Sequence, residues 1–151
     1  MDALDYKLLN LLQSNAKLTT KELSSQLFLS NTAIFERIKK LEKLKIIDKY
    51  VAVIDKKKVN KSFIVLCHIK LTHHTKNSIK KFEDDILQLK EVSECYHVSG
   101  DYDYIIKVCL ENVEAYRQFL VSKLTSLENI GSTHSTFVMG EIKNTFAIEM
   151  G

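Results

Sequence analysis

Apolar side chains in the first sixty residues recur at the spacing of short amphipathic helices. The first group marks one helical face and consists of Leu4, Leu8, Leu11 and Leu12. A second helix is expected from Thr19, because Thr19 and Glu22 have the spacing of a capping box. Ser30 is suited to cap a third helix. The inward stripe of that helix is Ile34, Ile38 and Leu41. Three short helices, with a brief connection between the last two, predict a helix-turn-helix domain.

The pattern changes after the third helix. Residues 48–55, DKYVAVID, are typical of a strand or a small wing. The polar run DKKKVNKS at 55–62 separates them from the next apolar pattern. We therefore predict an N-terminal (winged) helix-turn-helix domain at 1–50, a strand-containing linker at 51–62 and a second domain at 63–151.

The second domain alternates strand-like and helix-like segments. Strands are expected at 63–71, 92–98, 104–110, 132–139 and 142–150. A helix is expected between the strands 63–71 and 92–98, with an inward face that consists of Ile79, Phe82, Ile86 and Leu89. A second helix, capped by Asn112, places inward Val113, Tyr116, Leu120, Leu124 and Leu127. The order βαββαβ, with one more strand at the end, predicts a ferredoxin-like αβ sandwich, so the chain as a whole is α+β.

The sheet of this sandwich has a second face, which its two helices do not cover. Strict alternation places on it Ile64, Leu66, Ile105 and Cys109. These side chains are too apolar to remain in water, so self-association through this face is expected.

Positive charge is concentrated in the first domain. The formal net charge is only +3, but residues 1–60 carry +5 and residues 61–151 carry −2. A local basic surface raises affinity for phosphates through counterion release, so double-stranded DNA is an expected partner. A solvated basic face without function is the alternative. Glu36 would repel phosphates unless it pairs with Arg37 or Lys40, or accepts a hydrogen bond from a cytosine amine.

Composition narrows the location. The longest apolar stretches fall far short of the ~18 residues that a membrane span needs. The first ten residues lack the basic region and cleavage site of a secretory leader. Three singly placed cysteines are typical of reduced thiols, so a cytoplasmic protein is expected.

Four segments together resemble the Lrp/AsnC family, the feast/famine transcription regulators of bacteria and archaea. They are LDYKLLNLLQSNAKLTTKEL (4–23), LSNTAIFERIKKLEKLKII (29–47), EVSECYHVSGDYDYIIKV (91–108) and TFVMGEIK (136–143). The resemblance implies a helix-turn-helix joined by a short strand-containing linker to an αβ sandwich. It also implies a homodimer that assembles to an octamer or higher, and a small effector, commonly an amino acid, bound between dimers.

The resemblance assigns roles by position. Its DNA-binding set is Lys17, Thr19, Thr20, Lys21, Ser30, Asn31, Thr32, Phe35, Arg37, Lys39, Lys40 and Lys43. Its effector-binding set is Ser99, Gly100, Asp101, Tyr102, Asp103, Thr133 and Ser135, the last standing where the family typically has Thr. Asn31 replaces a usual Pro, and Lys45 replaces the usual Gly after the recognition helix. Lys45 is therefore expected to change the C-cap or to bear left-handed backbone strain.

The loop SGDYDY at 99–104 admits more than one interpretation. It is suited to be a tight hairpin in which Gly100 takes a positive φ and the aspartates bond local backbone. Its N–H groups are equally suited to hold a carboxylate, with Asp101 or Asp103 accepting from an ammonium group. A catalytic carboxylate pair is the third interpretation, and it lacks an accompanying nucleophile, His or glycine-rich phosphate loop.

The five histidines, His68 and His97 among them, lack the spacing of metal ligands, so neither a metal nor a cofactor is expected. The sequence therefore predicts a non-enzymatic, sequence-specific DNA-binding transcription regulator tuned by a small amino acid-like effector. Two alternatives stay open. One is an enzyme similar to sirohaem decarboxylases, which share the architecture. The other is an effector-binding domain with a vestigial DNA head.

Overall fold

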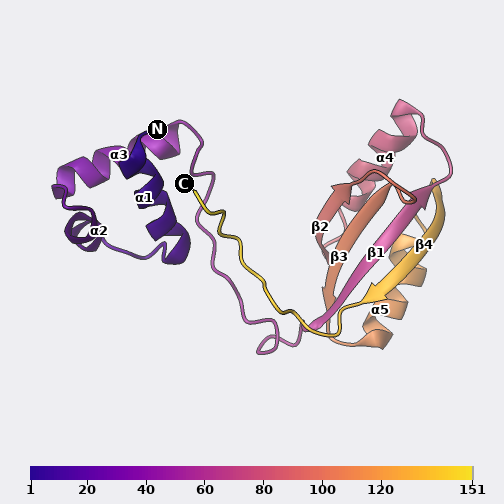
Figure 1. The fold of residues 1–151 in the computed structure, drawn as a ribbon. Helices are drawn as coiled ribbons and strands as arrows, with labels where there is room; N and C mark the ends of the chain where they lie inside the picture. Colours follow the sequence, from indigo (N-terminus) through magenta and orange to yellow (C-terminus); the bar gives the residue numbers. More distant parts are fainter. Residues whose placement is uncertain (151) are drawn as a thin grey trace. The chain divides into compact units, whose positions relative to one another are not determined.

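The computed structural model describes residues 1–150, which form two compact units (Figure 1). The first unit, here called the head, comprises Met1–Val53 together with residues 142–150. The second, here called the sandwich, comprises Ile54–Glu141. The C-terminal residues therefore belong to the N-terminal unit, although they follow the last strand of the sandwich.

The head is a three-helix unit built from α1 (Ala3–Ser14), α2 (Thr20–Leu27) and α3 (Asn31–Lys43). Its core consists of Leu8, Leu9, Leu12, Leu23, Leu27, Ile34 and Leu41. The predicted caps are confirmed: Thr19 and Glu22 form a capping box, and the Ser30 hydroxyl accepts from the Ala33 amide at 3.1 Å. α1 has a further capping box, between Asp2 and Asp5.

The strand or wing expected after α3 is absent, because residues 44–62 contain no strand. Val51 and Val53 alternate as a strand would, yet they are 61% and 73% exposed. A strand needs a partner for its backbone ladder. Here residues 55–61 form local turns instead, with the Lys61 amide donating to the Lys56 carbonyl at 2.7 Å.

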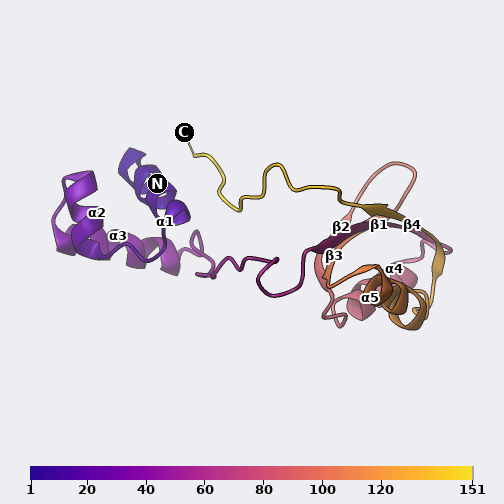
Figure 2. The same cartoon turned by 90° about the horizontal axis from the view of Figure 1, so that it is seen from below.

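The sandwich contains one antiparallel sheet of four strands. These are β1 (Phe63–Leu71), β2 (Val92–His97), β3 (Tyr104–Leu110) and β4 (Ile130–Phe137), in the spatial order β2-β3-β1-β4. α4 (Lys76–Ile86) and α5 (Val113–Phe119) both cover the same face, as Figure 2 shows. α5 continues into a π-helical turn, Leu120–Leu124. The expected βαββαβ order is confirmed.

The sandwich core lies between the sheet and its two helices. Alternate residues of β1 and β3 face it, beginning with Val65 and Tyr104, and α4 and α5 contribute Phe82, Ile86, Tyr116 and Phe119. The inward placement of Val113 was wrong, because this side chain is 59% exposed. Val113 is the first residue of α5 and precedes the residues that face the sheet, so it lies outside the buried stripe.

The last predicted strand, 142–150, is also absent. After Phe137 the Val138 amide donates to the Ile64 carbonyl at 3.0 Å, and residues 138–150 then form no helix or strand. The backbone at the end of the chain is bonded by side chains of α1 instead of by a neighbouring strand. The second sheet face carries the expected apolar residues: Ile64 is buried outside the helix-covered core, and Leu66, Ile105 and Cys109 are half-buried.

Candidate DNA-reading surface and effector hollow

The outer face of α3 presents polar and basic side chains to solvent. Ile34 and Leu41 point into the core, whereas Phe35, Lys39 and Lys40, which lie between them and were assigned to DNA, remain exposed. Phe35 is 50% exposed, with the Lys39 ammonium 5.7 Å from its ring centroid. Ser30, Asn31 and Thr32 occupy the start of the helix, where exposed amides and small polar groups are suited to meet base edges.

Charge on this face is only partly neutralised. Lys39 pairs with Glu42 at 3.0 Å, and Glu42 also accepts from the Tyr50 hydroxyl at 3.1 Å. These two donors, Lys39 first, lower the pKa of Glu42. Lys40 and Lys43 form no salt bridge within residues 1–150. Glu36 forms none there either, so neither Arg37 nor Lys40 neutralises its charge within residues 1–150.

Arg37 lies apart from this surface. Its Nη1 donates to Asp5 Oδ1 at 2.6 Å and to both oxygens of Asp2 at 2.9 and 3.0 Å. Burial favours the neutral form of Asp5, but the Asp2 amide and the guanidinium outweigh it, so the pKa of Asp5 is lowered. The Asp5 amide and then Arg37 lower the pKa of Asp2. The structure thus places the guanidinium against the first turn of α1.

Near the start of α2 lie two exposed lysines and a threonine, Thr19, whose hydroxyl is already bonded to Glu22. Lys17 and Lys21 form no salt bridge within residues 1–150, and Thr20 is half-buried. The Thr19 hydroxyl accepts from the Glu22 amide at 3.2 Å and donates to Glu22 Oε2 at 2.7 Å. The amide and hydroxyl of Thr19 lower the pKa of Glu22.

The end of α3 bears the backbone strain expected from the sequence. Lys45 has φ = 58°, in the left-handed region. The amides of Ile46 and Ile47 both donate to the Leu41 carbonyl, at 3.0 and 3.2 Å, which closes the helix. Glycine accepts this conformation without a Cβ penalty, whereas lysine does not.

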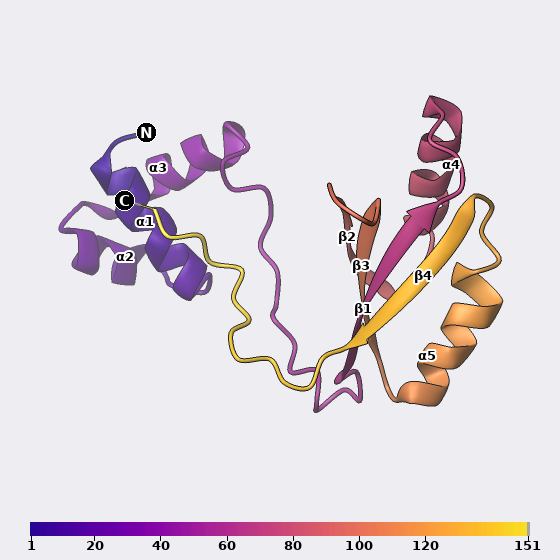
Figure 3. The same cartoon turned by 45° about the vertical axis from the view of Figure 1, so that its right-hand side comes forward.

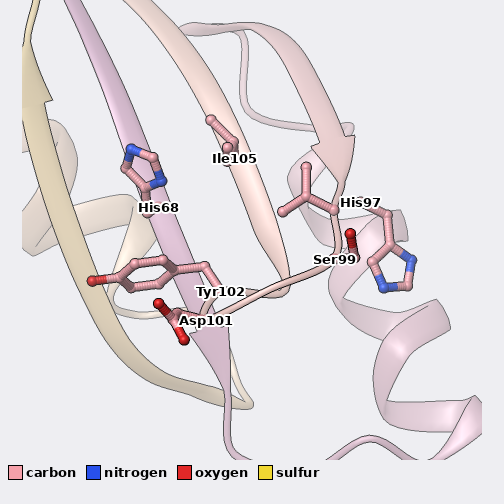
Figure 4. A pocket seen from close by; sticks show the side chains of 7 residues that line it. His68, His97, Ser99, Asp101, Tyr102 and Ile105 are labelled. Carbon is pink, nitrogen blue, oxygen red and sulfur yellow. The ribbon is translucent and has the colours of Figure 1, made fainter.

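A shallow hollow lies on the sandwich, where the turn between β2 and β3 meets β1 (Figure 4). Its lining residues are His68, His97, Val98, Ser99, Asp101, Tyr102 and Ile105. Figure 4 shows His68, Tyr102 and Asp101 grouped together, while His97 points away from them toward a helix. The Asp101 carboxylate accepts no hydrogen bond from residues 1–150 and is exposed.

The turn itself is fixed by hydrogen bonds of Asp103. Gly100 has φ = 117°, as expected for the turn. The Val98 amide donates to the Asp103 carbonyl at 2.9 Å. The Asp103 carboxylate accepts from the Leu71 amide at 2.7 Å and contacts His74 Nε2 at 2.9 Å. The Leu71 amide is the main reason that the pKa of Asp103 is lowered, with His74 acting in the same direction. Of the two aspartates, Asp101 alone points to the hollow.

The structure does not bring Thr133 and Ser135 to this hollow. They stand opposite Ile69 and Cys67 in the β1·β4 register and share the helix-covered face with them. The Ser135 hydroxyl lies 2.5 Å from the Tyr116 hydroxyl, inside the sandwich. His134, one residue away, stands opposite His68 on the other face. The rings of Tyr102, His68 and His134 form a group with centroids 5.2 to 6.2 Å apart.

Sequence reasoning missed His68, His97, Val98 and Ile105 as lining residues. The signal for His68 was present, since its position in β1 alternates with buried residues and places it on the open face. His97 stacks on Tyr104, with centroids 4.5 Å apart, and Tyr104 donates to Glu83 at 2.7 Å.

Two family models match this chain. The Lrp/AsnC ligand binding domain matches residues 64–148, and the AsnC-type helix-turn-helix domain matches residues 1–42. The chain belongs to the Lrp/AsnC family. This Lrp/AsnC protein is a DNA-binding transcription regulator, and its sandwich is the family's ligand-binding domain.

Relatives match over nearly the whole chain. The leucine-responsive regulatory protein of Haemophilus influenzae is 35% identical over 145 residues, covering 96% of this chain and 87% of that protein. The Escherichia coli K12 protein of the same name is 32% identical over 145 residues, covering 96% and 88%.

Solved structures have the same fold. An AsnC family transcriptional regulator from Agrobacterium tumefaciens is 34% identical, with a TM-score of 0.94 over 98% of this chain and 96% of that one. A transcriptional regulator from Neisseria meningitidis, crystallised with L-Met, is 28% identical, with the same TM-score of 0.94 and the same coverage of 98% and 96%. Within residues 1–150 of the Lrp/AsnC protein described here, no helix has the length and hydropathy that crossing a membrane requires.

Proposed function

We propose that this Lrp/AsnC regulator reads double-stranded DNA in the cytoplasm as a homodimer, with α3 of each head in the major groove. The observation that supports this most is the exposed α3 face. Its start holds Ser30, Asn31 and Thr32, and its later turns hold Lys40 and Lys43, which form no salt bridge with the described residues 1–150. The first group is assigned to base edges, together with Phe35. The lysines are assigned to phosphates, together with Lys17, Lys21 and Lys39.

Arg37 takes a different role from the one its position in the family suggested. Its guanidinium is bound by Asp2 and by buried Asp5, so engaging a phosphate would require it to leave a buried carboxylate without its partner. We assign Arg37 to holding α3 against α1. Thr19 likewise serves its capping box, so of the two threonines assigned to DNA we keep Thr20 as the contact to the DNA backbone.

The sandwich is proposed to bind a small amino acid at the hollow, and to have no catalytic activity or cofactor. The free carboxylate of Asp101 is suited to accept from the ligand ammonium, and the turn amides at Ser99–Tyr102 are suited to the ligand carboxylate. The L-Met complex of the Neisseria relative supports this class of ligand. No group of three or more potential metal ligands occurs within residues 1–150.

Assembly is proposed to use the open sheet face. Half-buried Leu66 and Ile105 lie there beside the paired Lys107 and Glu94, whose nitrogen and oxygen are 2.9 Å apart. Two copies meeting through this face would remove its apolar area from water, as a stable dimer requires. Larger assemblies, up to an octamer or beyond, would then present several heads to one DNA.

The proposal for DNA is tested by salt dependence. Fluorescence anisotropy with a DNA duplex from upstream of the protein's own coding region would compare the wild type with Lys40→Ala and Lys43→Ala. Each substitution should lower the slope of log affinity against log salt by about 0.9, because one phosphate contact is lost. Lys90→Ala, an exposed lysine of the sandwich, is the matched control and should leave the slope unchanged. Equal slopes in all four proteins would refute the assignment of α3.

The proposal for the ligand is tested by calorimetry with the twenty amino acids. Asp101→Asn should weaken binding of the tightest ligand at least about tenfold, because the ammonium loses a charged acceptor. Asp84→Asn, on the exposed side of α4, is the control. Unchanged affinity in Asp101→Asn would move the site away from the hollow.

A further inference from the structure

The C-terminal segment 145–150 is held on α1 by two side-chain amides, although the match to the family's ligand-binding domain extends as far as residue 148. Gln13 Nε2 donates to the Ile148 carbonyl at 2.9 Å, and Gln13 Oε1 accepts from the Ile148 amide at 2.7 Å. Asn10 Nδ2 donates to the Met150 carbonyl at 3.0 Å. Figure 3 shows the end of the chain beside α1.

These contacts have the chemistry of strand pairing. A glutamine amide carries one acceptor and donors in nearly the geometry of a peptide group, so Gln13 pairs with Ile148 as a neighbouring strand residue would. Asn10 lies one turn earlier on α1 and binds two residues further along the segment, so the segment runs antiparallel to α1. The Met150 side chain packs against the head core. The docking thus combines sequence-independent backbone bonds with one apolar anchor.

The chain upstream of this segment passes beside the hollow in β4. β4 carries His134, which stands opposite His68 and shares the aromatic group with Tyr102. His68 and Tyr102 both line the hollow. The chain then leaves β4 after Phe137 and continues without any helix or strand to Ile148. The backbone from His134, beside the hollow, to Ile148 therefore connects the hollow with the hydrogen bonds that Asn10 and Gln13 of α1 make to the C-terminal segment.

The C-terminal segment binds α1, and α1 in turn contacts α3 through an ion pair. The first turn of α1 contains Asp5 and is preceded by Asp2, the two partners of Arg37 on α3. A shift of α1 would therefore displace α3, because the two helices are joined by this ion pair and by the shared core of the head. A docked and an undocked tail are the two discrete states that coupling between distant sites needs.

We propose that the outer face of α1 at Asn10 and Gln13 is a docking surface for the C-terminal segment, and that the docked segment transmits effector binding at the hollow to the DNA-reading α3. The second half of the proposal rests on the effector function proposed above. The docking itself does not, and the two halves are measured separately.

The test uses the full chain with Gln13→Met, which removes both hydrogen bonds and keeps a good helix former of similar size on an exposed position. Gln118→Met is the matched control, because Gln118 is also exposed on a helix and its side chain has no hydrogen bond within residues 1–150. Hydrogen exchange of the Ile148 amide reports docking. DNA anisotropy with and without a saturating amino acid, each of the twenty in turn, reports transmission.

Docking predicts that exchange at Ile148 is at least about tenfold faster in Gln13→Met than in the wild type and the control. Equal exchange in all three proteins would overturn the docking surface. Transmission predicts a several-fold effector-induced change in DNA affinity in the wild type, within the usual range of about 5–150-fold. That change should fall to less than twofold in Gln13→Met, while calorimetry gives the same affinity for the amino acid.

Two results would overturn transmission. An effector response in Gln13→Met equal to that of the wild type would show that the signal takes another route. A wild type that responds to none of the twenty amino acids would refute the effector function and transmission together, while protected exchange at Ile148 would still establish the docked segment.

Discussion

Replacing Arg37 with alanine separates a residue that positions α3 from one that contacts DNA. The guanidinium meets Asp5, whose side chain is 1% exposed, at 2.6 Å, and its own side chain is 25% exposed. Removing one partner of a buried ion pair costs about 3–5 kcal/mol. Asp5 keeps the Asp2 amide as a donor at 3.0 Å, so the expected loss is smaller, about 2–3 kcal/mol.

The assay has two parts. Thermal unfolding should show the transition of the head lowered by about 10 °C or more. DNA anisotropy at a temperature where the head of Arg37→Ala is still folded should show weaker specific binding with an unchanged salt slope. A direct phosphate contact would instead lower the slope by about 0.9 with little effect on stability.

Asp5→Asn sharpens the distinction, because it removes one negative charge and so raises the net charge of the head by one. Electrostatics alone predicts tighter binding to any DNA. A positioning role predicts weaker binding to the specific site and little change on scrambled DNA. The reasoning would be refuted if the stability of Arg37→Ala stays within about 0.5 kcal/mol of the wild type and its salt slope falls by about 0.9.

Three further predictions concern other features of the fold. Lys45→Gly should stabilise the head by about 0.5–1 kcal/mol in chemical denaturation, because glycine removes the Cβ penalty at φ = 58°; a loss of stability would show that the Lys45 side chain makes a compensating contact. The head should have its full stability at pH values above the ordinary pKa of aspartate. Its stability should fall as the pH drops through the lowered pKa values of Asp2 and Asp5, because the folded state then has to take up protons. Melting curves from pH 7 to 2.5 that are the same for the wild type and Asp5→Asn would contradict this. Leu66→Asp should reduce the assembly to monomers in light scattering, because a charge cannot be buried unpaired on the open sheet face; an unchanged mass would place the interface elsewhere.

Regular elements were predictable because their signals are local. The Thr19–Glu22 capping box and the alternation in 63–71 each lie within a few residues, and both are confirmed. The strain at Lys45 was also predictable, since the helix end requires a left-handed residue there and the chain supplies no glycine.

The strands expected at 48–55 and 142–150 failed for a different reason. Alternation shows that a segment is able to form a strand, but a ladder also needs a partner, and partners are set by tertiary structure. Within the described residues the first segment has none, and the end of the second is bonded by Asn10 and Gln13.

Site residues depended on geometry that one sequence does not encode. Arg37 has the charge and the helix position of a DNA contact. Its ion pairs with Asp2 and Asp5 become visible only in the folded head. Thr133 and Ser135 were assigned to the effector by family position, whereas the β4 register turns them toward Ile69 and Cys67. A shift of one residue changes the face of a strand, and His134 is the residue on the open side.

The most direct test of the account is the affinity of the full chain for a duplex from upstream of its own coding region, measured by fluorescence anisotropy against a scrambled duplex of equal length near physiological salt. A head that reads DNA through α3 predicts binding to the upstream duplex at least about 10³-fold tighter than to the scrambled one. Equal and equally salt-sensitive affinity for both duplexes would contradict it, and would leave α3 as a basic surface without sequence readout.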